Sequence, residues 1–251
     1  MKLNQVNTEK KNLALVSLIN GYDQILPIDT NFIIPPDRSK TVRNCRAIPF
    51  GVFQRIWIKP LITTFPYLAI HESVHTEINS TIILKYVDNL INGTPPSLIL
   101  LSDTDLTHQE EVIRSTIEQK IAVQTNYDPI QDNKTDRGEV KSLSYIATKS
   151  LLYFCSHDSN AIRLIECADK FNTNLEDVNA IRTYEIIYYL LKMQMSHKDD
   201  LRMLYRYLYY LSPSDKKSNP SWNEFVNDMD ALYGNEISQS KNKPIPLILN
   251  N

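Results

Sequence analysis

Residues 24–36 read Gln-Ile-Leu-Pro-Ile-Asp-Thr-Asn-Phe-Ile-Ile-Pro-Pro. The apolar run 25–28 ends on Asp29, and a second apolar patch, 32–34, follows an Asp-Thr-Asn turn. Apolar residues on both sides of Asp29 predict a strand that is buried on both faces, as in a parallel sheet. Asp29 would then lie at the carboxyl edge of the sheet, where open α/β folds bind their ligands. A buried carboxylate is costly unless a partner neutralises it, and a metal ion is one candidate.

Length and composition are those of a globular protein. The chain has 251 residues, of which 42% are hydrophobic and 22% are charged, so it can form one large domain or two small ones. A net charge of -2 gives no overall attraction to nucleic acid, so nucleic-acid binding would require a local basic patch. The three cysteines form no CxxC pair and no disulfide-like spacing, which fits a reducing compartment. Without a signal-like start or a long apolar run, we expect a cytoplasmic protein with no membrane segment.

Apolar periodicity and turn signals predict strands that alternate with helices. The predicted strands are 25–28, 67–70, 97–101, 151–155 and 178–183. The predicted helices are 8–21, 49–63, 73–91, 136–149, 159–171, 185–195, 197–211 and 222–233, with a further helix behind a capping box at Thr107–Glu110. Pro60 is expected to shorten or kink the helix 49–63, and Ser73 to be the N-cap of the helix 73–91. This alternation predicts an α/β fold with an open, mostly parallel central sheet flanked by helices. We expect residues 1–195 to form this domain, 196–234 a helical carboxyl-terminal extension packed on it, and 235–251 a polar, extended tail.

Acidic residues follow the ends of the predicted strands. They are Asp29, Glu72 and Glu77, Asp103 and Asp158, while Asp136 and Glu139 open the helix that leads into the fourth strand. Carboxylates that converge without cysteine or histidine form a hard, oxygen-rich site suited to Mg²⁺ or Mn²⁺. Such ions activate water and stabilise developing charge when a phosphodiester is cut. Asp103 is interpreted as a surface turn residue.

At four places the chain resembles the PIN-domain nucleases. Ile28-Asp29-Thr30-Asn31-Phe32 is similar to the family's first-strand signature, and Ile70-His-Glu-Ser-Val-His-Thr-Glu77 to its acid on the helix after a strand. Asp136-Arg-Gly-Glu139 is similar to a Gly-Glu helix opening, and the segment from Leu152 to Arg163 to the strand with a following acid. The resemblance spans roughly residues 25–183. His157 departs from it, because the family often has a second acid or a small polar residue there.

The resemblance implies a PIN-like fold and a metal-dependent endoribonuclease. Its catalytic residues and metal ligands would be Asp29, Glu77, Glu139 and Asp158, with Asp136 and Glu72 as further candidate ligands. Whether Glu72 or Glu77 is the second acid stays open, although the spacing favours Glu77. Thr30 and Asn31 would orient the attacking water or a carboxylate. The basic cluster Arg38, Lys40, Arg43 and Arg46 would hold the phosphates of the RNA, single-stranded or structured. The implied cofactor is Mg²⁺ or Mn²⁺, and the implied setting is a toxin or defence system, with an antitoxin or partner protein and a homodimer left open.

Simpler interpretations exist for each residue. Asp29 could form an Asx-turn, Asp158 an N-cap, Glu139 a capping box with Asp136, and Glu77 a solvated first-turn acid. The basic residues could form only a solvated loop. His71-Glu72-Ser-Val-His75 also spells the HExxH pattern of zinc hydrolases, but His71 is expected to precede the helix. A third alternative is an inactive PIN-like interaction protein that binds a partner through the Tyr-rich helices 184–191 and 204–211.

Overall fold

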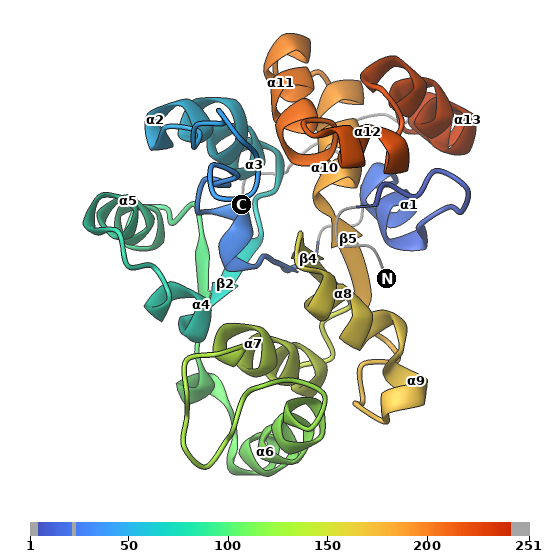
Figure 1. Ribbon diagram of the computed structural model, residues 1–251. Coiled ribbons are helices and arrows are strands. Elements are labelled where there is room, and N and C mark those ends of the chain that lie inside the picture. The colour runs from blue at the N-terminus through green and yellow to red at the C-terminus, as the bar shows by residue number, and fades with distance from the viewer. Residues whose placement is uncertain (1–4, 22–23, 242–251) are drawn as a thin grey trace.

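Five short strands, each parallel to its neighbours, form the centre of the molecule in a computed structural model that describes residues 5–21 and 24–241 (Figure 1). They are β1 (Leu26–Pro27), β2 (Leu68–His71), β3 (Ile99–Leu101), β4 (Tyr153–Ser156) and β5 (Asn179–Arg182). All five lie where the sequence predicts a strand. The α/β class with parallel strands is therefore confirmed.

The strand order reverses at β1. Strands β1, β2 and β3 pair in that order, and β4 pairs with β5. A parallel bridge between Ile28 and Cys155 joins the two groups, and the Asp29 backbone N–H donates to the Cys155 carbonyl at 3.0 Å. The spatial order is thus β3-β2-β1-β4-β5: the chain runs outward from β1 through β2 to β3, and then crosses back to the other side of β1 to form β4 and β5. In open α/β sheets, the carboxyl ends of the strands at such a reversal form the ligand-binding crevice.

Helices and helical turns connect the strands. Those before β3 are α1 (Leu13–Ile19), η1 (Thr30–Phe32), α2 (Phe50–Phe53), η2 (Gln54–Ile58), α3 (Lys59–Thr64), α4 (Glu72–Thr76) and α5 (Thr81–Ile91). Those after it are η3 (Asp103–Asp105), α6 (His108–Ala122), α7 (Arg137–Thr148), α8 (Ser159–Glu166), α9 (Ala168–Phe171), α10 (Thr183–Lys192), α11 (Lys198–Tyr209), α12 (Pro213–Ser218) and α13 (Trp222–Lys241). The capping box at Thr107 and Glu110 is confirmed at the start of α6.

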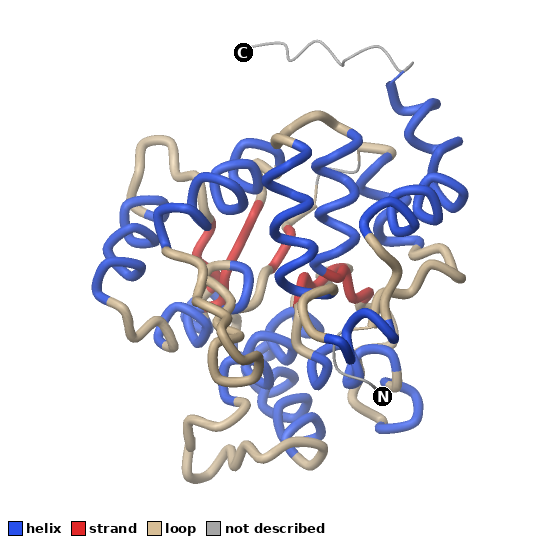
Figure 2. Tube along the Cα trace, turned by 45° about the horizontal axis from the view of Figure 1, so that its top comes forward, coloured by secondary structure: helices blue, strands red, loops and turns tan. Residues whose placement is uncertain are grey.

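Alternate strand residues face two different cores, because successive side chains of a strand point to opposite faces. Tyr153, Cys155 and Ile181 join the larger core with α1, α3, α10, α11 and α13. Phe154 and Ala180 join a second core with α6, α7, α8 and α9. The sheet is therefore the middle of three layers, and Figure 2 shows the strands between helices. Burial on both faces explains why the strands read as continuous apolar runs.

The predicted carboxyl-terminal extension shares the larger core. Leu201 of α11 and Phe225 of α13 are completely buried in the same cluster as Leu15 of α1 and Ile28. The end of this region corrects the prediction, because residues 235–241 are helical rather than extended. Ile237 continues the four-residue apolar spacing of α13 into the core, which keeps the helix intact beyond Asn235. The rest of the predicted tail, 242–251, lies outside the described residues.

The helix predicted over 73–91 is wrong in two respects. It is two helices, α4 and α5, separated at Glu77–Ser80, and His71 rather than Ser73 is the N-cap of α4. The His71 imidazole accepts the Ser73 backbone N–H at 3.3 Å. Asn79 and Ser80 favour turns and caps over helix interiors, and they end the periodic pattern there.

Three other boundaries differ from the prediction. Helix α1 begins only at Leu13, because Asn12 caps it by accepting the Ala14 backbone N–H at 3.0 Å. The helix predicted over 159–171 breaks at Cys167 into α8 and α9. Pro60 does not end its helix: a π-helical turn, η2, precedes α3, and Pro60 lies in the first turn of α3, where its missing N–H is tolerated. No helix within residues 5–21 and 24–241 combines the length and apolar character needed to cross a bilayer.

Candidate metal centre

The predicted acids Asp29 and Asp158 follow β1 and β4, the two strands at which the strand order reverses. Asp29 is only 8% exposed, and within the described residues its carboxylate accepts hydrogen bonds only from its own turn and from Ser156. Its Oδ1 accepts the Thr30 backbone N–H at 2.6 Å. Its Oδ2 accepts the Asn31 amide at 2.6 Å and the Ser156 hydroxyl at 2.9 Å. Asp29 is therefore the N-cap of η1, but it does not form the expected Asx-turn, because its carboxylate accepts the N–H of the next residue and not of the one after it. The same hydrogen bonds hold the carboxylate at the edge of the sheet.

Glu77 joins Asp29 through Thr30. The Thr30 hydroxyl donates to Glu77 Oε2 at 2.6 Å, and the Gly138 backbone N–H donates to Oε1 at 2.9 Å. A Cβ on Gly138 would overlap the Glu77 carboxylate, so this close approach requires glycine. Glycine at this position thus lets α7 bring Glu139, the next residue, beside the other acids.

Glu139 is the least satisfied acid of the group. Its Oε1 atom is buried and has no hydrogen-bond partner within the described part of the chain. The capping box predicted for it does not form: Asp136 has a left-handed backbone, with φ of 58°, and its side chain makes no cap hydrogen bond to α7. Instead, the Asp136 carboxylate accepts the Asn126 backbone N–H at 2.9 Å. Asp136 lies near enough to Glu139 for its charge to raise the pKa of that carboxyl.

Asp158 is the exposed member of the group. It caps α8 by accepting the Asn160 backbone N–H at 2.7 Å, as the simpler interpretation expects. Its own backbone N–H donates to the Ser156 hydroxyl at 2.9 Å, and that hydroxyl donates to Asp29. Ser156 was not assigned from the sequence, although a small polar residue between a buried strand and an acid is a signal that could have indicated it.

Electrostatics connect the four acids. Burial raises the pKa of Asp29 to about 6, opposed by the hydrogen bonds from Ser156 and Thr30 and reinforced by the charges of Asp158 and Glu77. Burial likewise raises the pKa of Glu139 to about 9, with further increases from Asp158, Asp29 and Asp136. The guanidinium of Arg163 lowers the pKa of Glu139. The site thus concentrates negative charge, and a cation would stabilise it.

A hydrogen bond between Asn31 and His157 connects the turns that follow β1 and β4. The Asn31 side chain donates to Asp29 and accepts the His157 backbone N–H at 3.0 Å. His157 Nδ1 lies 3.0 Å from the Tyr209 hydroxyl, and burial together with the charge of Arg38 lowers its pKa to about 4. Thr30 and Asn31 therefore position carboxylates, the second of the two roles expected for them.

The basic cluster divides into two parts. Arg38 donates to Asp215 at 2.7 Å and to the carbonyls of Tyr207 and Leu208, so its guanidinium is paired within the protein. Lys40, Arg43 and Arg46 are exposed, and their side chains make no hydrogen bond or ion pair among the described residues, although the charge of Lys40 acts on Asp37. The charge of Arg38 lowers the pKa of His157, so the part of the basic loop that carries Arg38 lies near the turn that ends β4.

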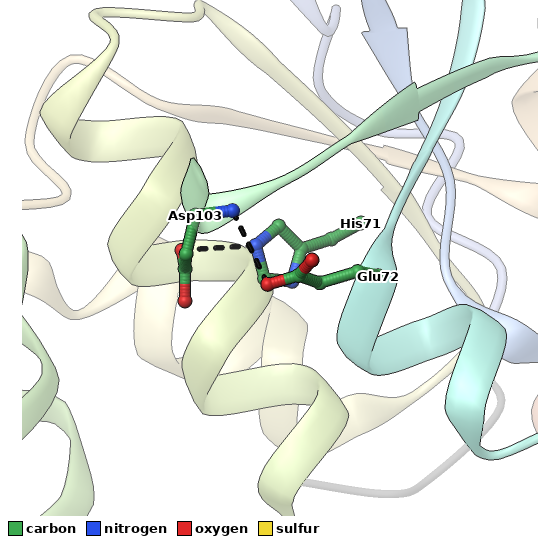
Figure 3. Close-up of side chains that lie close together, drawn as sticks. All are labelled: His71, Glu72 and Asp103. Carbon is green, nitrogen blue, oxygen red and sulfur yellow. Dashed lines mark hydrogen bonds and ion pairs between the residues drawn. The ribbon is translucent and has the colours of Figure 1, made fainter. Parts of the chain in front are cut away.

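Glu72 belongs to a different cluster, with His71 and Asp103 (Figure 3). Its two carboxylate oxygens accept the Ser102 hydroxyl at 2.5 Å and the Asp103 backbone N–H at 3.2 Å. Asp103 lies in the η3 turn, as expected, and its side chain is 31% exposed, but its Oδ1 also lies 3.2 Å from His71 Nε2. The second acid of the Asp29 group is therefore Glu77.

The ligand atoms of this second cluster already have partners. Asp103 Oδ1 also accepts the Arg114 guanidinium at 2.8 Å, and His71 Nδ1 lies 2.7 Å from the Ser73 hydroxyl. The HExxH pattern does not assemble a zinc site, because His71 ends β2 and His75 Nε2 lies 2.8 Å from Asp88 instead. Within the described residues, His71, Glu72 and Asp103 are the only group of three whose ligand atoms all lie within 4.8 Å of one another, so the acids of the Asp29 group are more widely spaced. The Asp29 group is preferred as the candidate metal centre because it contains the buried Glu139 oxygen that has no partner.

No protein-family model, curated protein or solved structure matches this chain.

Proposed function

We propose that this protein is a divalent-metal-dependent nuclease that cuts RNA. The observation that carries the proposal is the buried, unpartnered Oε1 of Glu139 beside Asp29, Glu77 and Asp158, at the point where the strand order reverses. The donor set consists only of carboxylate oxygens, which are the ligands that Mg²⁺ and Mn²⁺ prefer.

Asp29, Glu77, Glu139 and Asp158 are the residues that would hold the ion, and Asp136 is close enough to add its charge. A bound ion would lower the pKa of a water molecule and offset charge on the phosphate. Thr30, Asn31 and Ser156 keep the carboxylates in place by the hydrogen bonds described above. The reaction is hydrolysis: water adds to phosphorus as a P–O bond breaks, with no covalent enzyme intermediate.

The basic loop suits the other part of the substrate. Lys40, Arg43 and Arg46 are exposed on the loop that follows Asp29, and Arg38 of the same loop lies close enough to His157 to lower its pKa. Exposed cationic side chains that form no ion pair within the protein are available to bind a phosphate backbone.

The first test compares wild type, Asp29→Asn and Asp103→Asn. We expect wild type to cut a labelled single-stranded RNA with Mg²⁺ or Mn²⁺ and to bind Mn²⁺ in calorimetry. Asp29→Asn should lower activity by more than the roughly 10–100-fold typical of residues that only support a metal site. Asp103→Asn removes an acid of the second cluster and should retain cleavage.

Two results would count against the proposal. Cleavage that survives Asp29→Asn but not Asp103→Asn would move the site to the His71 cluster. An absence of both cleavage and Mn²⁺ binding in the wild type would favour the interaction-protein alternative.

A further inference from the structure

A cavity of about 410 Å³ opens at the carboxyl ends of β4 and β5, beside the candidate metal centre. Its walls come from residues 5–9, from the turn after β4, from the start of α10 and from the end of α12. Its size lies within the range of small-molecule sites, about 300–1,000 Å³. The proposed hydrolysis of a phosphodiester does not use this space.

The cavity and the metal centre share one turn. Ser156, His157 and Ser159 line the cavity, while the intervening residue, Asp158, belongs to the acid group. Ser156 also donates to Asp29. A nucleotide whose phosphate lies against the acids can therefore place its neighbouring base on the other side of this turn.

The lining favours an uncharged polar ligand over an anion. Hydroxyl and amide side chains dominate its polar part: Gln5, Asn7, Thr8, Ser159 and Ser218. Ser156 also borders it, but is completely buried and hydrogen-bonded to Asp29 and Asp158. The guanidinium of Arg182 is paired with Glu166, and Glu9 adds a negative charge. Tyr184 and Tyr209 also border the cavity, but their side chains are only 1% and 2% exposed, so the polar groups at its surface decide which ligand fits. A nucleobase, flat and edged with donors and acceptors, is the part of RNA that matches this lining.

We infer that the cavity binds the nucleobase next to the scissile phosphate and so gives the enzyme a base preference at its cleavage site. This inference rests on the proposed nuclease function. It identifies the substrate as single-stranded RNA, since a paired base is not free to enter a pocket.

The test fills the cavity from a lining residue that is not part of the acid group. Ser218 ends α12, and its side chain makes no hydrogen bond to another described residue, so Ser218→Trp adds bulk without touching the carboxylates. RNA randomised around the cut would be digested by wild type, Ser218→Trp and the control Ser218→Ala. We expect a wild-type preference at one position next to the cut, retained in Ser218→Ala. In Ser218→Trp, kcat/KM for the preferred base should fall about 10–100-fold, with Mn²⁺ affinity unchanged.

A second measurement does not depend on cleavage. Binding of the four nucleosides to metal-free protein would be followed by ligand-observed NMR. We expect saturable binding of at least one nucleoside to wild type and loss of that binding in Ser218→Trp. If Ser218→Trp does not fold, Asn7→Trp fills the same cavity from another lining residue, which is exposed.

The outcomes separate the two proposals. Cleavage without a base preference, or a preference that survives a folded cavity-filling variant, would overturn the pocket and leave the nuclease. Absence of cleavage would overturn the nuclease. Nucleoside binding that the tryptophan blocks would still support a base-binding cavity, and absence of such binding would overturn it.

Discussion

Gly138 is the residue on which the acid group most directly depends. Its missing side chain leaves room for the Glu77 carboxylate, which accepts its backbone N–H. Asp29 reaches the same carboxylate through Thr30. One position in α7 therefore controls how closely three of the acids approach.

Gly138→Ala should displace Glu77 and weaken Mn²⁺ binding by about 10–100-fold, because the new methyl group occupies the place of the carboxylate. The matched control is Gly234→Ala, also in a helix, where a Cβ meets nothing within 4 Å. That change should leave metal binding intact and stabilise the protein by about 0.5–1 kcal/mol. Calorimetry with Mn²⁺ on both variants decides the matter, and wild-type affinity in Gly138→Ala would show that Glu77 is not a ligand.

Glu139 should make the metal-free protein less stable as pH rises. Its pKa is about 9 in the folded protein against an ordinary value of 4.5, so the folded state binds more protons between these values. The free energy of unfolding then falls with increasing pH in this window. Glutamine does not titrate, so the free energy of unfolding of Glu139→Gln should not show this decrease with rising pH.

We expect the melting temperature of metal-free Glu139→Gln to exceed that of wild type by an amount that grows between about pH 6.5 and 8.5. This range lies above the pKa of Asp29, about 6. A difference of about 1–2 kcal/mol would correspond to about 2–8 °C. Saturating Mn²⁺ should stabilise wild type more than the variant, because the ion binds the folded state through Glu139. A difference independent of pH would mean that Glu139 is already ionised and compensated.

Among the elements, the loop after β1 combines a structural arginine with three exposed cations. Arg38 holds the loop on α11 and α12 through the carbonyls of Tyr207 and Leu208 and through Asp215. The Tyr207 hydroxyl adds a second fastening by donating to the Arg46 carbonyl at 3.0 Å. The four residues, predicted as one phosphate-binding group, therefore have different roles.

Replacing Lys40, Arg43 and Arg46 together by alanine should weaken RNA binding without lowering the melting temperature. Each lost phosphate contact should reduce the slope of log K against log salt by about 0.7, so by about 2 for all three. Arg38→Ala should instead lower the melting temperature, since it leaves Asp215 without its cation. Fluorescence anisotropy at several salt concentrations measures the slope. An unchanged slope in the triple variant would make the loop merely solvated.

The whole molecule packs the carboxyl-terminal helices into the core of the sheet. Phe225 of α13 is completely buried and stacks on Tyr205 of α11 with ring centroids 4.4 Å apart. Both rings belong to the cluster that contains Ile28, the residue before Asp29. The extension therefore supports the strand that carries the candidate site.

Phe225→Ala should cost about 3–5 kcal/mol, the range for removing a buried aromatic ring. Met203→Ala, at a residue that is 42% exposed, should cost less than about 0.5 kcal/mol. Urea unfolding of wild type should show one transition that shifts as a whole in Phe225→Ala. Two separate transitions, with only one affected by the variant, would show that residues 196–234 form an independent unit.

Periodicity and turn chemistry in the sequence were enough to predict the class of the fold. The apolar runs around Leu26 and Phe154 predicted strands in the interior of the protein, and the acids after them were expected at one edge of the sheet. Hydrogen bonds between residues close in sequence could also be predicted, as the Thr107 capping box shows. These features depend on residues close together in the chain, so a single sequence contains them.

The sequence alone determined that this chain builds parallel strands whose ends carry carboxylates. Only the tertiary structure decided which distant groups meet: Glu77 rather than Glu72 with Asp29, Gly138 beneath Glu77, and Arg38 on Asp215. Such contacts depend on the order of the strands and on how the helices pack against both faces. Strand order is set by the fit of whole surfaces, and no local pattern in the chain records it.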